Sequence, residues 1–263
     1  MRNSKIYTVI SEILCLFFLL LFVYPLVLMV GKAFDNGGIE NFARVFHFFD
    51  LWKNLRTSIL TVGGTLLIVG FCTSLAAFSF SKLRFRGKNI LYYVFLTGLM
   101  IPASSLLFPL YQIVRLFHFN NTPLALIFPY AALNCCFNLL ILKNYYDTLP
   151  SELMDAGRID GANTWQIFCL VMQPIARPGL VFVLIQTFLS AWNELQMGMI
   201  FITDNDIQPL SVIPLRFLET RSPGFTSNVL YAALVICLVP IGIFYVFASR
   251  KLVSGLSAGA VKG

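Results

Sequence analysis

The eighteen residues from Ile13 to Val30, ILCLFFLLLFVYPLVLMV, decide the class of fold, because no charged side chain interrupts them. A helix of this length rises about 27 Å, close to the roughly 30 Å thickness of a bilayer hydrocarbon core. The run is longer than the apolar segment of a signal peptide, which has about 7 to 15 residues, and no small-x-small cleavage site follows it. The sequence therefore predicts a membrane helix that is retained.

Further apolar runs of similar length follow along the whole chain. They are Ser58 to Phe80, Ile90 to Val114, Pro123 to Leu142, Gly179 to Ile202 and Val229 to Ala248. Hydrophobic residues make up 58% of the chain and charged residues only 12%, which excludes an ordinary soluble domain. Helices satisfy their own backbone groups in lipid. We therefore expect an all-α membrane protein with six transmembrane helices, folded as a single domain over residues 1–263.

Lysine and arginine residues between the spans predict the orientation, because they are enriched on the cytoplasmic side. One side would hold twelve of them: Arg2, Lys5, Lys82, Arg84, Arg86, Lys88, Lys143, Arg158, Arg177, Arg250, Lys251 and Lys262. The other would hold seven: Lys32, Arg44, Lys53, Arg56, Arg115, Arg216 and Arg221. Both termini are therefore predicted to be cytoplasmic, and the basic turn from Lys82 to Lys88 is interpreted as a topology signal. Since these residues do not gather on amphipathic elements, nucleic acid is not an expected partner.

The stretch from Lys143 to Pro178, between the fourth and fifth spans, is cytoplasmic by this count and too polar to cross the membrane. Ser151 is expected to cap a short helix that Gly161 ends in a left-handed conformation. Asn163 and Gln166 have the spacing that opens a second helix. Small residues edged by charges let a partner's backbone approach closely and fix its orientation. The predicted docking element consists of Glu152, Asp155, Ala156, Gly157, Arg158, Asp160, Gly161 and Ala162.

The segment LPSELMDAGRIDGA (149–162), followed by Phe168, Gln173-Pro174 and Arg177-Pro178, resembles the EAA loop of ABC importer permeases. In that family the loop forms a coupling helix that sits in a cleft of the ATP-binding subunit. The family triplet Glu-Ala-Ala is Asp155-Ala156-Gly157 here, and Gln173 replaces the usual Leu. Asp155 keeps the charge on a shorter side chain, and Gly157 keeps the small surface but loosens the helix.

Other stretches resemble the carbohydrate branch of the same family, the maltose-permease-like second membrane subunit. They are Trp192-Asn193-Glu194, the ending GLSAGAVKG (255–263), Phe78 to Gly87, and Ile101-Pro102. The resemblance covers roughly the last four-fifths of the chain, and its motifs occur in the family's order. It implies a transmembrane subunit of a binding-protein-dependent importer that moves a sugar or oligosaccharide across the bacterial or archaeal cytoplasmic membrane.

The resemblance also implies partners: a dimer of ATP-binding subunits, a second permease subunit that makes a heterodimer, and an extracytoplasmic sugar-binding protein. The chain has no G-x-x-x-x-G-K-[ST] phosphate loop. It is therefore expected to be a transport subunit and not an enzyme. No cofactor is expected on this chain, and ATP and magnesium are expected on the partner subunits.

Candidate substrate contacts lie near the end of the fifth predicted span and in the fourth. Glu194 is the only acidic residue well inside a predicted span, where a carboxylate is costly enough to predict a functional or paired role. Trp192 suits stacking on a sugar ring and Asn193 suits bonding to hydroxyls, but the same trio equally suits helix packing or a gate. Asn134 and Asn138 share one helix face, which either lines a pore or makes interhelical hydrogen bonds.

Two other classes of function compete with the importer. A proton-coupled secondary transporter would use Glu194 as its carrier, but typically places more ionisable groups in its spans. An integral-membrane enzyme would cluster His, Asp or Cys residues near one interface. His47 and His118 are isolated, and the six cysteines show no CxxC spacing, so no metal site is expected.

Overall fold

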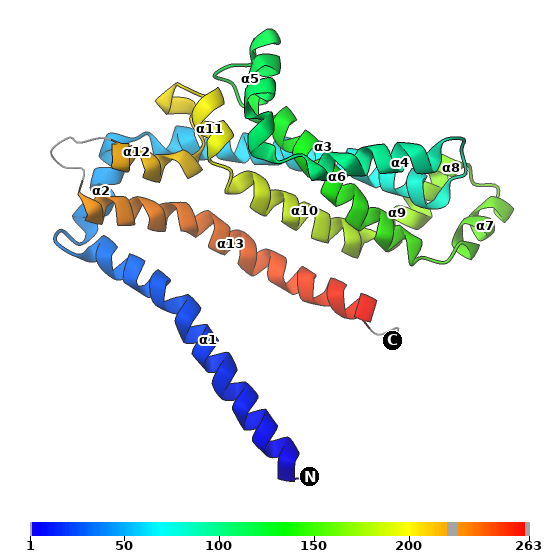
Figure 1. Cartoon of the computed structure of the whole chain (residues 1–263), viewed down its shortest axis with the longest axis horizontal. Helices are drawn as coiled ribbons and strands as arrows, with labels where there is room; N and C mark the ends of the chain where they lie inside the picture. Colours follow the sequence, from blue (N-terminus) through cyan, green and yellow to red (C-terminus); the bar gives the residue numbers. More distant parts are fainter. Residues whose placement is uncertain (1, 220–225, 261–263) are drawn as a thin grey trace. The chain divides into compact units, whose positions relative to one another are not determined.

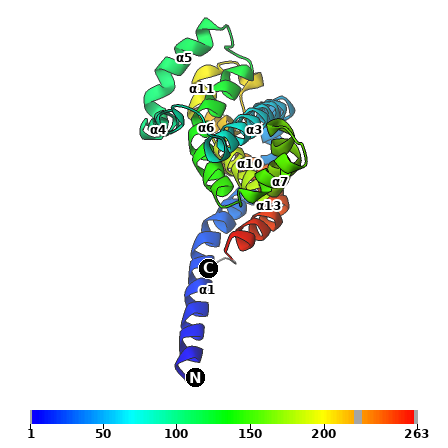
Figure 2. The same ribbon diagram turned by 90° about the vertical axis from the view of Figure 1, so that its right-hand side faces the viewer.

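The computed structural model describes residues 2–219 and 226–260, and this part of the chain contains helices and no strand. The chain divides into two compact units (Figures 1 and 2). The first comprises residues up to Leu51 together with Ile213–Pro240, and the second comprises Trp52–Val212 and the chain beyond Ile241. The single domain predicted over residues 1–263 stays a prediction.

The first unit contains α1 (Arg2–Phe34), α2 (Ile39–Phe48), α12 (Ile213–Glu219) and the start of α13 (Ser227–Ala260). The buried Asn41 side chain fastens α2 to the end of α1, since its Nδ2 donates to the carbonyls of Ala33 (3.0 Å) and Asp35 (2.8 Å). Nδ2 of Asn228 donates to the same Asp35 carbonyl at 2.6 Å. The most apolar window of α1 buries none of its residues. Such a surface is suited to lipid or to another subunit.

The second unit is built on three helices that run side by side: α3 (Leu51–Lys82), α6 (Leu124–Asp147) and α10 (Arg177–Trp192) (Figure 1). Their shared core includes Phe78 of α3, Leu139 and Tyr146 of α6, and Val183 of α10, all buried. The same cluster includes Met154 and Phe168 from the segment between α6 and α10. That segment is therefore anchored to the membrane helices and is not a free loop.

Four of the predicted spans are continuous helices that are long and apolar enough to cross a membrane. They are Ile10–Phe34, Leu51–Lys82, Leu124–Asp147 and Ser227–Ala248. Two bent helix pairs bring the count to six if each pair forms one span. The all-α membrane class is confirmed, and the six-helix count depends on how the bent pairs are counted.

The third span is not the continuous helix predicted from Ile90 to Val114. It consists of α4 (Lys88–Thr97) with η1 (Gly98–Met100), then η2 (Ala103–Leu106) with α5 (Leu107–Leu116), and the halves meet at 94°. Pro102 explains the break, since a proline disfavours helical backbone at the residue before it. Ile101 is accordingly extended, with φ −91° and ψ 117°.

The fifth span also differs from the predicted helix between Gly179 and Ile202. Helix α10 ends at Trp192, and after a short break α11 (Gln196–Phe201) begins. Upstream lie α8 (Thr164–Gln166), a π-helical turn η3 (Ile167–Met172) and α9 (Gln173–Ile175), which pair with α10 at a bend of 75°. Ile167, Phe168 and Met172 from this stretch pack in the core, whereas Leu170 is exposed. Helix α6 also continues to Asp147, past the predicted start of the polar segment at Lys143, and the extent of that segment outside the membrane stays a prediction.

Replacing Gly179 by Ala is expected to destabilise the packing of α10 on α6. A methyl group at this position would lie 2.6 Å from Cγ of Tyr145, so the helix and the ring must separate. Overpacking of this kind costs about 1–3 kcal/mol, and the melting temperature of the purified protein in detergent should fall by roughly 3–10 °C. Gly63→Ala is the control, because a methyl group there meets open space. Equal melting temperatures for the two variants would contradict the prediction.

Candidate functional site

The short helix α7 (Glu152–Ile159) has a fully bonded end. Gly161 is left-handed, with φ +79°, as predicted. The Ala162 amide donates to the Gly157 carbonyl at 2.9 Å, and the Gly161 amide donates to the Arg158 carbonyl at 3.0 Å. These two bonds make a Schellman cap, which fixes where the helix stops. The predicted side-chain cap at Ser151 is wrong, since its side chain makes no capping hydrogen bond and its backbone angles are helical, with φ −71° and ψ −23°.

The chain after α7 restarts as predicted. Oδ1 of Asn163 accepts from the Gln166 amide, and Oε1 of Gln166 accepts from the Asn163 amide, both at 2.9 Å. This reciprocal capping box satisfies two amides at the start of α8. The whole stretch from α7 to α8 therefore has a defined backbone and can act as a stiff element.

Helix α7 turns one side inward and leaves the other exposed. Met154 and Gly157 are buried, and a Cβ at Gly157 would lie 3.0 Å from Cγ1 of Ile167. Gly157 therefore serves packing inside the chain and does not lie on the outward surface predicted for it. The exposed predicted residues are Glu152, Asp155, Ala156, Arg158, Asp160 and Gly161, and Ala162 is half-buried.

Two apolar side chains join the charges on the outward surface and were missed by the sequence analysis. Ile159 is 86% exposed at the end of α7, and Trp165 is 57% exposed at the start of the next helix. Ile159 follows the buried Met154 by five positions, which places it on the opposite helix face. The spacing of Met154 and Ile159 could have predicted this exposed side chain, because an apolar residue opposite the buried face of a charged helix favours a docking surface.

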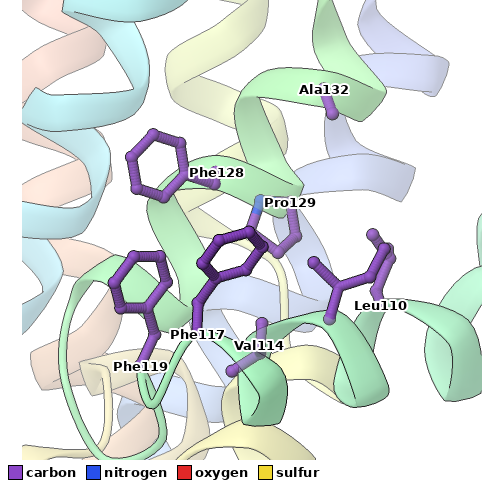
Figure 3. A pocket seen from close by; sticks show the side chains of 8 residues that line it. Leu110, Val114, Phe117, Phe119, Phe128, Pro129 and Ala132 are labelled. Carbon is purple, nitrogen blue, oxygen red and sulfur yellow. The ribbon is translucent and has the colours of Figure 1, made fainter.

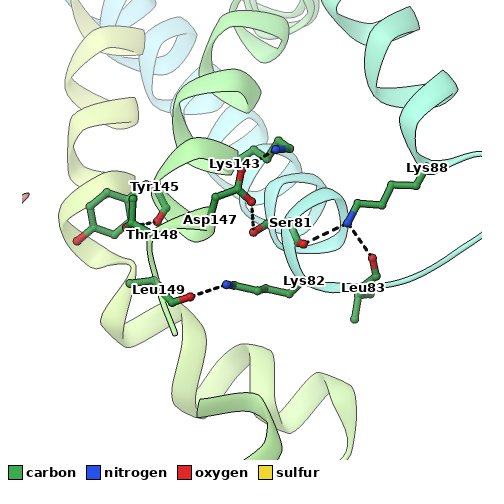
Figure 4. Close-up of polar contacts among 9 residues, drawn as sticks. All are labelled: Ser81, Lys82, Leu83, Lys88, Lys143, Tyr145, Asp147, Thr148 and Leu149. Carbon is green, nitrogen blue, oxygen red and sulfur yellow. Dashed lines mark hydrogen bonds and ion pairs between the residues drawn. The ribbon is translucent and has the colours of Figure 1, made fainter. Parts of the chain in front are cut away.

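Polar contacts tie the segment before α7 to α3 and α4 (Figure 4). Nζ of Lys82 donates to the Leu149 carbonyl at 2.6 Å. Asp147 accepts from Oγ of Ser81 and pairs with Nζ of Lys143, both at 2.6 Å. Nζ of Lys88 donates back to the Ser81 carbonyl at 3.1 Å and to the Leu83 carbonyl at 3.0 Å. The basic turn thus has a structural role in addition to the topology signal read from the sequence.

Glu194 lies in the break between α10 and α11 and has several partners. Its Oε2 accepts from Oη of the buried Tyr130 at 2.6 Å. The carboxylate also accepts from the amides of Met197 (3.0 Å) and Gly198 (3.2 Å). The main-chain carbonyl of Glu194 accepts from Oγ of Ser211 at 2.8 Å. Glu194 therefore joins α6 to the start of α11. Its predicted position well inside a helical span is wrong, whereas the paired role is what the structure shows.

The other candidates for the substrate path are mostly engaged in helix packing. Trp192 is buried and stacks on Phe188, with ring centroids 5.4 Å apart. Nδ2 of Asn138, also buried, donates to Oγ1 of Thr187 at 3.0 Å, which is the interhelical alternative stated above. Asn134 donates to the Tyr130 carbonyl on its own helix. Asn193 is exposed and bonds only to the Leu189 carbonyl among the described residues, so it is the member of the set most open to a ligand.

A cavity of about 440 Å³ lies between α5 and α6 (Figure 3). Its lining is wholly apolar: Leu110, Ile113, Val114, Phe117, Phe119, Phe128, Pro129 and Ala132. A sugar site needs several convergent hydrogen-bonding groups. This cavity is therefore not a candidate for the sugar. Among the residues that the structure describes, no three His, Cys, Asp or Glu side chains are placed to hold a metal ion.

Sequence comparison matches residues 70–257 to the family described as binding-protein-dependent transport system inner membrane component. A diacetylchitobiose uptake system permease protein of Streptomyces coelicolor is 26% identical over 99% of this chain and 91% of its own length. A trehalose/maltose transport system permease protein of Thermococcus litoralis is 32% identical over 86% of this chain and 81% of its own length. These matches run through α7 and the break at Glu194.

Solved structures share the fold. A chain from a bacterial ABC transporter involved in the import of the acidic polysaccharide alginate superposes with a TM-score of 0.81 at 19% identity, covering 95% of this chain and 98% of that one. A chain of the inward-facing methionine ABC transporter MetNI gives 0.55 at 20% identity, covering 78% and 97%. At such identities the likeness concerns the fold alone.

Removing the Glu194 carboxylate should loosen the start of α11. We expect Glu194→Ala to lower both uptake and melting temperature, since Tyr130 and two amides lose their acceptor and each buried loss costs about 1–3 kcal/mol. Glu194→Gln should be milder, because a neutral amide oxygen still accepts, and Tyr130→Phe should remove only the link to α6. Uptake in cells and melting of the purified complex test the order. An Ala variant equal to wild type in both would show that the carboxylate does not hold this break.

Proposed function

Because the chain belongs to the family of binding-protein-dependent transport system inner membrane components, we propose that it forms part of the pore of an importer for a sugar or oligosaccharide. It is a membrane-embedded transport component that works with an ATPase and a substrate-binding protein. The relatives named above for diacetylchitobiose and for trehalose and maltose support a saccharide substrate. The many bonds to Glu194 give no support to its use as a proton carrier.

The outward surface of α7 is the observation that carries the mechanism. It presents charges together with the exposed Ile159 and Trp165, while Met154 and Gly157 on its inward side are buried. We place an ATP-binding subunit against this surface. A stiff, anchored helix moves with the spans it is packed on, so ATP-driven closure of two such subunits would shift the equilibrium between inward-facing and outward-facing states.

The remaining partners and the orientation complete the proposal. A second permease subunit completes the pore as a heterodimer, and an extracytoplasmic binding protein delivers the sugar. ATP and magnesium bind on the ATP-binding dimer and not on this chain. Both termini lie in the cytoplasm of a bacterium or archaeon, and the exposed Asn193 faces the sugar path beside the break that Glu194 holds.

Gly161→Leu is expected to uncouple transport from ATP hydrolysis or to prevent assembly. Leucine is strained at φ +79°, and its side chain extends outward, because nothing in this chain lies within 4 Å of a Cβ there. Stimulation of ATPase activity by the loaded binding protein should fall at least tenfold in the purified complex.

Gly161→Asn tolerates the left-handed backbone and should retain most activity. Gly38→Leu is the control for backbone strain, because Gly38 also has a positive φ (+56°) and open space around Cβ, but it lies far from α7 in the sequence. Wild-type stoichiometry and stimulation in Gly161→Leu would show that α7 is not the transmission element.

The orientation is tested by reporters attached at two places. The twelve-to-seven bias in basic residues predicts that a reporter at the C-terminus is cytoplasmic, whereas one inserted between Asp204 and Asp206 is outside. Alkaline phosphatase and green fluorescent protein fusions give opposite signals on the two sides. A C-terminus found outside would place α7 away from ATP and would overturn the coupling role.

A further inference from the structure

A polar cavity of about 820 Å³ separates α7 from the basic turn between α3 and α4. Four basic side chains line it: Lys82, Arg84 and Lys88 from the turn and its flanks, and Arg158 from α7. The acidic side chain in its lining is Asp155, which already pairs with Arg158 at 2.9 Å. The lining therefore carries an excess of positive charge.

The positive charges on the turn are not neutralised by carboxylates in direct contact. Lys82 and Lys88 donate to the neutral carbonyls of Leu149, Ser81 and Leu83 (Figure 4). The nearby Asp147 is paired with Lys143. Arg84 is exposed and makes no hydrogen bond or ion pair with the residues that the structure describes. An anion placed here would meet a guanidinium with its donors still available.

A second hollow, of about 430 Å³, opens beside the same turn, at the start of α4. Arg84, Phe85 and Lys88 line both spaces, and the second is completed by Gly87, Asn89 and Ile90. Phe85 is 42% exposed and Ile90 is 72% exposed, at the start of the apolar helix α4. Cationic and exposed apolar groups thus meet at the start of α4, the first half of the third predicted span.

We propose that this turn binds the headgroup of an anionic phospholipid from the adjacent leaflet. The phosphate lies between Arg84 and Lys88, the acyl chains run along Phe85 and Ile90, and Arg158 of α7 faces the headgroup from across the cavity. Basic pockets at the cytoplasmic ends of membrane helices favour such headgroups. The apolar part of the lining favours a lipid over an acidic segment of a partner protein, which would need no hydrocarbon contact.

Through this site, the lipid composition would affect the coupling helix α7 and with it the ATPase activity. This consequence rests on the proposed function. A bound headgroup adds attraction between the turn and Arg158, so it holds α7 closer to the ends of α3 and α4. Stimulated ATPase activity should then rise with the fraction of anionic lipid. Binding itself requires neither ATP nor the binding protein.

Binding is measured first, by native mass spectrometry of the purified complex with phosphatidylglycerol or phosphatidylethanolamine added. Wild type should retain phosphatidylglycerol preferentially, and Arg84→Gln should bind it about fivefold more weakly, the effect of one basic contact near the membrane. Arg86→Gln removes the same charge from the same turn but lines neither cavity, so it should bind as wild type does. Equal retention by all three proteins would overturn the site.

Activity is measured second, in nanodiscs with increasing phosphatidylglycerol. The half-maximal fraction for stimulated ATPase should rise severalfold in Arg84→Gln and stay unchanged in Arg86→Gln. Loss of the ATP-binding subunit from Arg84→Gln in every lipid would identify a protein contact instead and overturn the lipid assignment, as would competition by inorganic phosphate alone. If no lipid supports stimulated ATPase in wild type, the proposed function fails, and the binding measurement still decides the lipid site.

Discussion

Hydrocarbon offers no hydrogen-bond partners, so wherever a membrane helix breaks, the chain itself must bond the backbone groups that the break exposes. Within the residues that the structure describes, the helices of the second unit break at Pro102, near Ala176 and at Glu194, and each break has its own solution. At Pro102 one amide hydrogen is absent by chemistry. Around Ala176 a π-helical turn and short helical pieces keep most backbone groups bonded. At Glu194 a carboxylate accepts the amides that begin the next helix. The start of α11 is fixed by these bonds to Glu194.

This constraint explains which parts of the fold were predictable. The length and hydropathy of an apolar run are enough to predict a membrane helix. The four continuous helices and the membrane class could therefore be predicted from the sequence. The ends of α7 and α8 were also readable, because Gly161 and the pair Asn163 and Gln166 carry local signals for caps. Ser151 shows the limit of such signals, since a residue type that suits a cap can precede a helix without bonding to its amides.

The misplaced elements depend on contacts that no local pattern contains. The run from Gly179 to Ile202 reads as one span in the sequence, because the residues on both sides of the break are apolar. The partner that explains the carboxylate of Glu194, Tyr130, lies on another helix and cannot be identified from the local sequence. Gly157 was assigned outward because small residues serve docking and close internal packing equally well. Its neighbour Ile167 settles the choice, and that contact exists only in the folded chain.

Intrinsic tryptophan fluorescence can report on contacts at two places in this chain. Trp165 stands beside α7 and is 57% exposed, whereas Trp192 is 7% exposed and stacked on Phe188. The emission maximum of an indole shifts to shorter wavelength when the ring is shielded from water. A protein that covers α7 should therefore shift the emission of Trp165, while the buried Trp192 serves as an internal reference. With Trp52 replaced by Phe, the remaining pair would separate an event at the surface of α7 from one at the break after α10, without any attached label.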